Sequence, residues 1–207
     1  MATRTRRAED PTTVTGPGSG PDETSILFFC TANRCRSPFA EAIALRQLGN
    51  RPFVVSSAGL LAGGHPVPKN GLKVASEFDL DLSAHRSRRA DLRNLAGWDV
   101  ILTMTREHIR EIVAANPALW PRVFTIKQFR RWIERNPPSR RARLGAWIDV
   151  AAAERSRFDM VGADPDDEID DPLFSPPEGW RELARVLHTE IGAIVRALTD
   201  SGRDARL

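Results

Sequence analysis

The residues most capable of chemistry are a cysteine and an arginine in one short stretch, Cys30-Thr31-Ala32-Asn33-Arg34-Cys35-Arg36-Ser37. A cysteine thiolate is a strong nucleophile. The planar fork of an arginine can hold two oxygens of a phosphate at once. Either residue alone is usually structural. Together, Cys30 and Arg36 predict nucleophilic attack on a bound oxyanion.

The segments on either side of this stretch are those that a phosphate-binding loop requires. Residues 26–29 form a short apolar run, typical of a strand buried on both faces. Pro38 suits a first helical turn, and a largely apolar helix is predicted to follow it. A loop between such a strand and a helix points backbone N–H groups and the helix dipole at one anion. The same dipole, with Arg36 and the hydroxyl of Ser37, favours the thiolate form of Cys30.

Strand and helix signals alternate along most of the chain. Three more strands are predicted at residues 53–55, 99–102 and 122–126. Further helices are predicted at residues 68–78, 87–95, 105–116 and 176–198. The alternation predicts one α/β domain, doubly wound around a four-stranded parallel sheet.

The ends and the composition of the chain set the limits of that domain. Residues 1–24 hold arginines followed by Pro, Thr, Gly and Ser without an apolar run, so we expect a disordered tail there. A second tail is expected at residues 201–207, which leaves a single domain at residues 25–200. No stretch approaches the roughly 20 apolar residues that span a bilayer. These features favour a cytoplasmic protein without a membrane partner.

Metal chemistry and structural disulfides find no support in the sequence. Cys30 and Cys35 are the only two cysteines of the 207 residues, and they lie too close together to staple a fold. His65, His108 and His188 show no metal-ligand spacing, and we expect them in loops or on solvent-facing helices. Neither a metal nor another cofactor is therefore expected.

The motifs, taken together, resemble the low-molecular-weight protein tyrosine phosphatases and the arsenate reductases that share their fold. Beside Cys-x5-Arg-Ser-Pro, the matching segments are Ser57-Ala58-Gly59, His85-Arg86-Ser87-Arg88, Ile101-Leu102-Thr103-Met104 and Asp171-Pro172. They occur in the family's order, and the resemblance covers residues 26–198. It implies that the four predicted strands lie in the order 2-1-3-4.

The resemblance also implies a role for the residues of the loop. Cys30 would attack phosphorus, Arg36 would hold the equatorial oxygens and Asp171 would protonate the leaving oxygen. Water would then hydrolyse the cysteinyl-phosphate, with Asp171 acting as base. The remaining members of the phosphate-binding loop are Thr31, Ala32, Asn33, Arg34, Cys35 and Ser37, of which Ser37 would stabilise the thiolate.

Two further features of the loop follow from the same resemblance. Asn33 would adopt a left-handed conformation, which asparagine tolerates, and would be supported by Ser57 and His85. Cys35 would either form a reversible disulfide with Cys30 or serve as a small buried side chain. Both roles of Cys35 remain open.

The choice of the acid rests on one proline. Six acidic residues lie between Asp164 and Asp171, and a charged run is usually a solvated loop. Pro172 follows Asp171, matches the family's Asp-Pro and would stiffen the loop. Asp170 is the alternative acid.

Substrate preference is less well determined than the reaction. The family walls its pocket with aromatic residues, yet this chain has no tyrosine, and residues 60–64 contain no aromatic. Phe174 alone could stack on a substrate ring. Arg34 stands where the family usually has an apolar residue and would add positive potential at the rim. We therefore expect phosphate-monoester hydrolysis first and phosphotyrosine preference second.

Three other interpretations stay open. The chain lacks the downstream cysteines of the thioredoxin-linked arsenate reductases, but arsenate reduction with an external small thiol needs only Cys30. A protein that binds phosphate without turnover is also conceivable. The six arginines of residues 130–143 could contact nucleic acid, although a solvated segment balanced by residues 164–171 is favoured. The expected partner is thus a phosphorylated protein or a small phosphate ester, and the oligomeric state is not predicted.

Overall fold

The computed structural model describes residues 12–17, 23–138 and 143–200 of the chain. The strands are β1 (Thr13–Val14), β2 (Thr24–Cys30), β3 (Phe53–Gly59), β4 (Arg89–Ala90), β5 (Val100–Thr103) and β6 (Val123–Thr125). The α-helices are α1 (Arg36–Leu48), α2 (Lys69–Glu77), α3 (Arg106–Ala115), α4 (Ile126–Arg135), α5 (Leu144–Ala151) and α6 (Pro177–Asp200). Short 3₁₀ turns are η1 (Leu92–Asn94), η2 (Pro117–Arg122) and η3 (Arg157–Met160).

The sheet is parallel, and its strand order is β1-β4-β3-β2-β5-β6. The four predicted strands correspond to β2, β3, β5 and β6, so the predicted class and the order 2-1-3-4 are confirmed for them. The count of four is wrong, because β4 and β1 extend the edge beside β3. Each has only two residues, too few to show a strand pattern in the sequence.

The short edge strands correct two other expectations. Thr13 and Val14 form β1 within residues 1–24, so disorder is the wrong description for these two residues. Residues 1–11, 18–22 and 201–207 lie outside the described part of the chain. The helix predicted at residues 87–95 is also wrong, because Arg89 donates its N–H to the carbonyl of Thr12 (2.7 Å), which holds this segment in the sheet.

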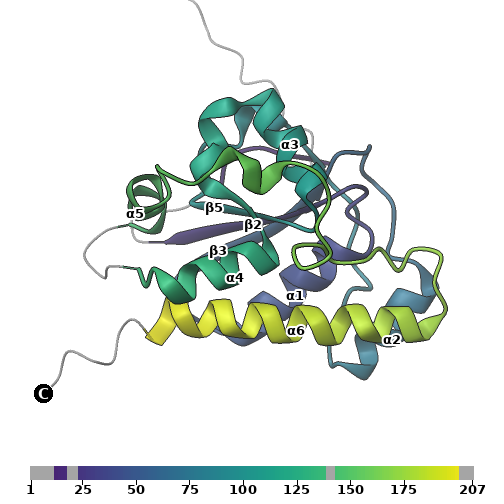
Figure 1. Cartoon of the computed structure of the whole chain (residues 1–207). Coiled ribbons are helices and arrows are strands. Elements are labelled where there is room, and N and C mark those ends of the chain that lie inside the picture. The colour runs from purple at the N-terminus through teal and green to yellow at the C-terminus, as the bar shows by residue number, and fades with distance from the viewer. Residues whose placement is uncertain (1–11, 18–22, 139–142, 201–207) are drawn as a thin grey trace, which may run out of the picture.

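Helices cover both faces of the sheet, which makes three layers. Figure 1 shows α1, α2, α4 and α6 on one face and α3 on the other. Each face has its own apolar core, one containing Phe28, Phe39, Leu102, Trp180 and Leu187 and the other containing Leu27, Phe29, Ile101, Ile109 and Trp120. Because β2 alternates between the two cores, both of its faces are buried, as its apolar run predicts.

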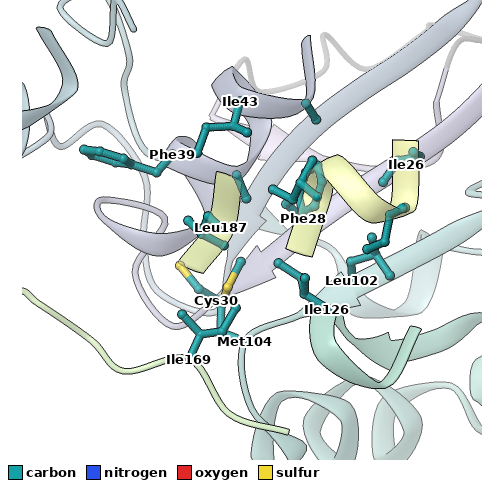
Figure 2. Packing of buried hydrophobic residues seen from close by; sticks show 14 of the residues in the cluster. Ile26, Phe28, Cys30, Phe39, Ile43, Leu102, Met104, Ile126, Ile169 and Leu187 are labelled. Carbon is teal, nitrogen blue, oxygen red and sulfur yellow. The ribbon is translucent and has the colours of Figure 1, made fainter. Parts of the chain in front are cut away.

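The carboxyl ends of β2 and β5 bring the chemistry-bearing loops together. Figure 2 shows Cys30 beside Met104 and Ile169 within the larger core. Ile169 is fixed there because its N–H donates to the carbonyl of Met104 (2.9 Å). The acidic segment after residue 164 is thus anchored over the end of the sheet, the usual place for a ligand in a doubly wound fold.

The arginine-rich segment is largely part of the folded domain. Arg130 and Arg131 lie on α4, which begins with a capping box formed by Thr125 and Gln128. Arg130 pairs with Glu190 of α6, and Arg131 pairs with Asp167 of the acidic segment. The expected balance with the acidic segment is confirmed for Arg131, while residues 139–142 lie outside the description. Within the described residues, no helix is long and apolar enough to cross a membrane.

Candidate active site

The loop between β2 and α1 curls around the sulfur of Cys30. The side chain of Cys30 is buried, and its Sγ lies 3.0 Å from Oγ of Ser37. The backbone N–H of Asn33 also donates to this Sγ (3.2 Å). These contacts fix the position of the Cys30 sulfur within the loop and support Cys30 as the candidate nucleophile, a role that stays a prediction.

Asn33 holds the loop in its curled shape. Its φ of 51° is left-handed, and the side chain is fully buried. Its Nδ2 donates to Oγ of Ser37 (2.9 Å) and of Ser57 (2.8 Å). Its carbonyl lies 2.9 Å from Nε2 of His85. The structure therefore contains the contacts to Ser57 and His85 that the resemblance implied, and their supporting role remains a prediction.

Asn33 and its partner Ser57 make further contacts outside the loop. Its Oδ1 accepts the backbone N–H of Arg88 (2.7 Å). Ser57 donates to Glu41 (2.5 Å), and Arg88 pairs with the same carboxylate (3.2 Å). Gly59 lies so close to the loop that a Cβ there would be 2.7 Å from the carbonyl oxygen of Thr31. The segments at residues 57–59 and 85–88 thus lie against the loop, as expected of segments that support its shape.

Arg36 connects the loop to the acidic segment. Its Nη2 donates to Oδ2 of Asp171 (2.6 Å) and to Oγ1 of Thr31 (3.3 Å). Its Nη1 donates to the carbonyl of Ile169 (3.3 Å). The side chain of Arg36 is only 6% exposed, whereas that of Asp171 is 38% exposed. The guanidinium is therefore held in place at the loop, with the carboxylate next to it at the surface.

Asp171, rather than Asp170, faces the loop. The N–H of Leu173 donates to Oδ1 of Asp171 (3.1 Å), a turn that Pro172 stiffens. Asp170 is exposed, and the described part of the chain shows no ion pair between it and Arg36. The contact to Arg36 supports Asp171 as the candidate acid, although its role stays a prediction.

Cys35 has a different environment from Cys30. It is buried at the start of α1, and both cysteines are free thiols. Burial, together with the nearby Asp171 and Cys30, raises the pKa of Cys35. The thiol form of Cys35 is therefore favoured over the thiolate. Neither of its two expected roles, redox partner or small core residue, is decided by this geometry.

The rim of the site is open and has little aromatic surface. Arg34 donates from Nε to the carbonyl of Pro66 (3.1 Å), so it binds the next loop rather than a local acid. Leu61 and Phe174 are 55% and 97% exposed. Ala32 is half-buried in the loop. No described group of three or more His, Cys, Asp or Glu side chains could hold a metal ion.

His108 is a residue near the loop that the sequence does not reveal. It is 3% exposed, and the expectation of a solvent-facing residue is wrong. Its Nε2 lies 3.0 Å from Oγ1 of Thr31, and its Nδ1 lies 2.9 Å from Oγ1 of Thr105. Its ring packs edge-on against Phe29 (5.8 Å between centroids). Thr105 caps α3 by accepting the N–H of His108, which places His108 on the turn that faces the loop.

Burial, ahead of the charge of Arg36, lowers the pKa of His108 to about 3. In the unfolded chain the imidazole takes up a proton below about pH 6.5, whereas in the folded protein it stays neutral. Stability should therefore fall as the pH drops from about 6.5 towards 3, by about 2 kcal/mol between pH 7 and pH 5 for this residue. Urea denaturation of the wild type and of His108→Gln at both pH values checks this. An equal loss of stability in the variant would contradict it.

Comparison with known proteins adds to this geometry. A family model described as low molecular weight phosphotyrosine protein phosphatase matches residues 25–137. The low molecular weight protein-tyrosine-phosphatase Wzb of Escherichia coli K12 is 32% identical over 120 residues, which are 58% of this chain and 80% of Wzb. An arsenate reductase of Bacillus cereus 03BB102 is 33% identical over 93 residues, 45% of this chain and 66% of that protein. The YwlE arginine phosphatase structure from Geobacillus stearothermophilus has 25% identity and a TM-score of 0.65, over 89% of this chain and 98% of YwlE.

Proposed function

The chain belongs to the low molecular weight phosphotyrosine protein phosphatase family, and on that premise we propose that it hydrolyses phosphate monoesters, above all phosphotyrosine in proteins. The observation that carries the proposal is the loop itself. Ser37 and the N–H of Asn33 contact the sulfur of Cys30, while Arg36 is anchored at the same loop. A nucleophile and a phosphate clamp are thus held together in advance of the reaction.

The reaction has two displacements. Sγ of Cys30 attacks phosphorus, the bond from phosphorus to the leaving oxygen breaks, and Asp171 gives that oxygen its proton. Asp171 then takes a proton from water as the water oxygen attacks phosphorus. The sulfur–phosphorus bond breaks, inorganic phosphate leaves, and the thiolate of Cys30 is restored. Arg36 stabilises the equatorial oxygens in both steps.

The ion pair between Arg36 and Asp171 must be exchanged during this cycle. A bound phosphate dianion competes for the guanidinium of Arg36 through two parallel N–H···O bonds. Asp171 is then released from Arg36 and can face the leaving oxygen. Substrate binding and acid catalysis are thus linked through Arg36.

The acid assignment predicts a difference between two neighbouring carboxylates. Asp171→Asn should lower kcat/KM, which reports formation of the intermediate, about 100-fold for an alkyl phosphate, whose leaving oxygen needs a proton, and much less for nitrophenyl phosphate. Asp170→Asn is the matched control and should change either rate less than about threefold. Steady-state kinetics on both substrates checks this. The reverse pattern would move the acid by one residue.

The substrate class is tested by comparing reactions on one preparation. Hydrolysis of a phosphotyrosine peptide should exceed that of phosphoserine and phosphoarginine peptides. The phosphoarginine peptide is included because YwlE, whose structure resembles this chain, is an arginine phosphatase. Because one relative is an arsenate reductase, thiol-dependent arsenate reduction is measured alongside. Faster arsenate reduction or phosphoarginine hydrolysis would overturn the proposed substrate. The absence of all turnover would favour a phosphate-binding protein.

A further inference from the structure

A buried positive charge lies apart from the catalytic loop. The side chain of Arg155 is 8% exposed. Its guanidinium lies over the rings of Phe124 and Trp120, at 3.7 and 4.1 Å from their centroids. Burial lowers the pKa of Arg155 to about 10, which leaves the group charged at neutral pH. A buried charge is costly unless an opposite charge and hydrogen bonds compensate for the lost contact with water.

The compensation that Arg155 receives is incomplete. Its Nη1 donates to the carbonyl of Val123 (3.0 Å), and its Nε lies 3.8 Å from Oδ2 of Asp159. Its buried Nη2 has no hydrogen-bond partner among the described residues. Contact with aromatic rings offsets part of the cost of burying a cation, but it does not satisfy an N–H group. Such an unpaired buried donor needs a physical explanation.

Arg155 lines a small cavity together with other cationic side chains. The cavity has a volume of about 150 Å³, and three more arginines, Arg106, Arg131 and Arg135, border it. Phe124 and Trp132 contribute apolar wall. Neither Cys30 nor Arg36 borders it, so the cavity is separate from the proposed active site. Its size admits a single small polyatomic anion with bound water.

The charges around the cavity leave an excess of one positive charge. Arg106 pairs with Asp164 and Asp167, and Arg131 also pairs with Asp167. Asp167 is buried and accepts a further bond from Gln128 (2.6 Å). Arg135 and Arg155 then face one remaining carboxylate, Asp159, whose side chain is 48% exposed and can turn to solvent.

We propose that this cavity binds a phosphate-type oxyanion, held by Arg155 from within and by Arg135 from its exposed edge. Arg135 donates from Nε to the carbonyl of Arg131 (3.0 Å). Its terminal nitrogens have no hydrogen bond or ion pair with a described residue, so they are available to a ligand. Guanidinium forks suit tetrahedral oxyanions. The ligand is either free phosphate, the product of the proposed reaction, or a phosphoryl group on a protein. Binding at this cavity does not depend on the proposed hydrolysis.

The test is an NMR titration of the ¹⁵N-labelled full chain with inorganic phosphate at constant ionic strength. Two independent sets of amide shifts are expected, one at residues 31–37 and one at residues 128–135 and 155–159. Arg155→Gln should abolish the second set, and Arg135→Gln should weaken its affinity roughly tenfold. Arg157→Gln, an exposed neighbour that does not border the cavity, is the matched control and should change neither set.

The first set also reports whether each variant is folded. If Arg155→Gln loses both sets of shifts, the variant is not folded. The test then rests on Arg135→Gln, whose exposed position should leave the fold intact. A wild type without the second set, or a second set unchanged by Arg135→Gln, would overturn the proposal. A repeat with a phosphopeptide, using Cys30→Ser protein to prevent turnover, separates the two sources. Tighter binding of the peptide assigns the site to phosphorylated proteins, and tighter binding of phosphate assigns it to the free ion.

Discussion

Replacement of Cys30 by serine should lower kcat/KM for an aryl phosphate by about four orders of magnitude or more. The serine hydroxyl is close in size to the thiol and can keep the contacts with Ser37 and Asn33. It lacks the thiolate, however, and the described residues that contact this sulfur, Ser37 and the N–H of Asn33, include no general base to activate a hydroxyl. Binding of phosphate should therefore persist while turnover is lost. Steady-state kinetics and inhibition by phosphate measure the two effects separately.

Cys35→Ser provides the control for this substitution. Cys35 lies in the same loop and is also buried, so any general damage to the loop should appear in both variants. Under reducing conditions we expect Cys35→Ser to retain activity within about threefold of the wild type. Substantial turnover by Cys30→Ser would remove Cys30 as the nucleophile, whatever the behaviour of the control.

Replacement of Arg36 by lysine should lower kcat/KM by about three orders of magnitude, although the charge is kept. Lysine cannot form two parallel bonds to phosphate, and it cannot reach Thr31, Ile169 and Asp171 together as Arg36 does. Loss of one donor to a transition-state oxyanion typically costs 10²–10³ in rate. Arg36 supplies more than one such donor. The same variant should bind phosphate more weakly, which product inhibition measures.

Arg34→Lys is the matched control, because Arg34 lies in the same loop but donates to the carbonyl of Pro66. Its activity should stay within a few-fold of the wild type. Equal losses in the two variants would indicate that replacing any arginine of this loop damages activity, and the fork of Arg36 would have no special part in the reaction. An Arg36→Lys variant with near-normal activity would remove the clamp from the mechanism.

The sequence is most informative where one local pattern determines the structure. The apolar run of β2, the loop after it and the proline of α1 predict a phosphate-binding site at the carboxyl end of a buried strand, and the geometry of Cys30 and Asn33 agrees. The resemblance to a family adds the contacts of Ser57 and His85, which no local pattern contains. The choice of Asp171 among six acidic residues likewise rests on the family's Asp-Pro motif and not on a local pattern.

Other features depend on contacts between distant segments, and the sequence does not reveal them. The edge strands β1 and β4 exist because Thr12 and Arg89 meet across the sheet edge. His108 is buried because Thr31 and Phe29 approach it from β2 and its loop. Arg155 is buried by Trp120 and Phe124 from earlier in the chain. A polar residue on a short helix or turn gives no signal of such burial before the tertiary structure is known.

The central claim is that Cys30 carries the phosphoryl group during turnover, and rapid-quench mass spectrometry tests it most directly. Asp171→Asn slows hydrolysis of the intermediate, whereas its formation from nitrophenyl phosphate, a good leaving group, needs the acid much less. This variant, mixed with nitrophenyl phosphate, should therefore accumulate the phosphorylated enzyme. Peptide mapping should then place the phosphoryl group on Cys30, with none on Cys35 and none in the Cys30→Ser protein. Turnover with the phosphoryl group on another residue, or with no phosphoryl-enzyme at any time point, would contradict the account.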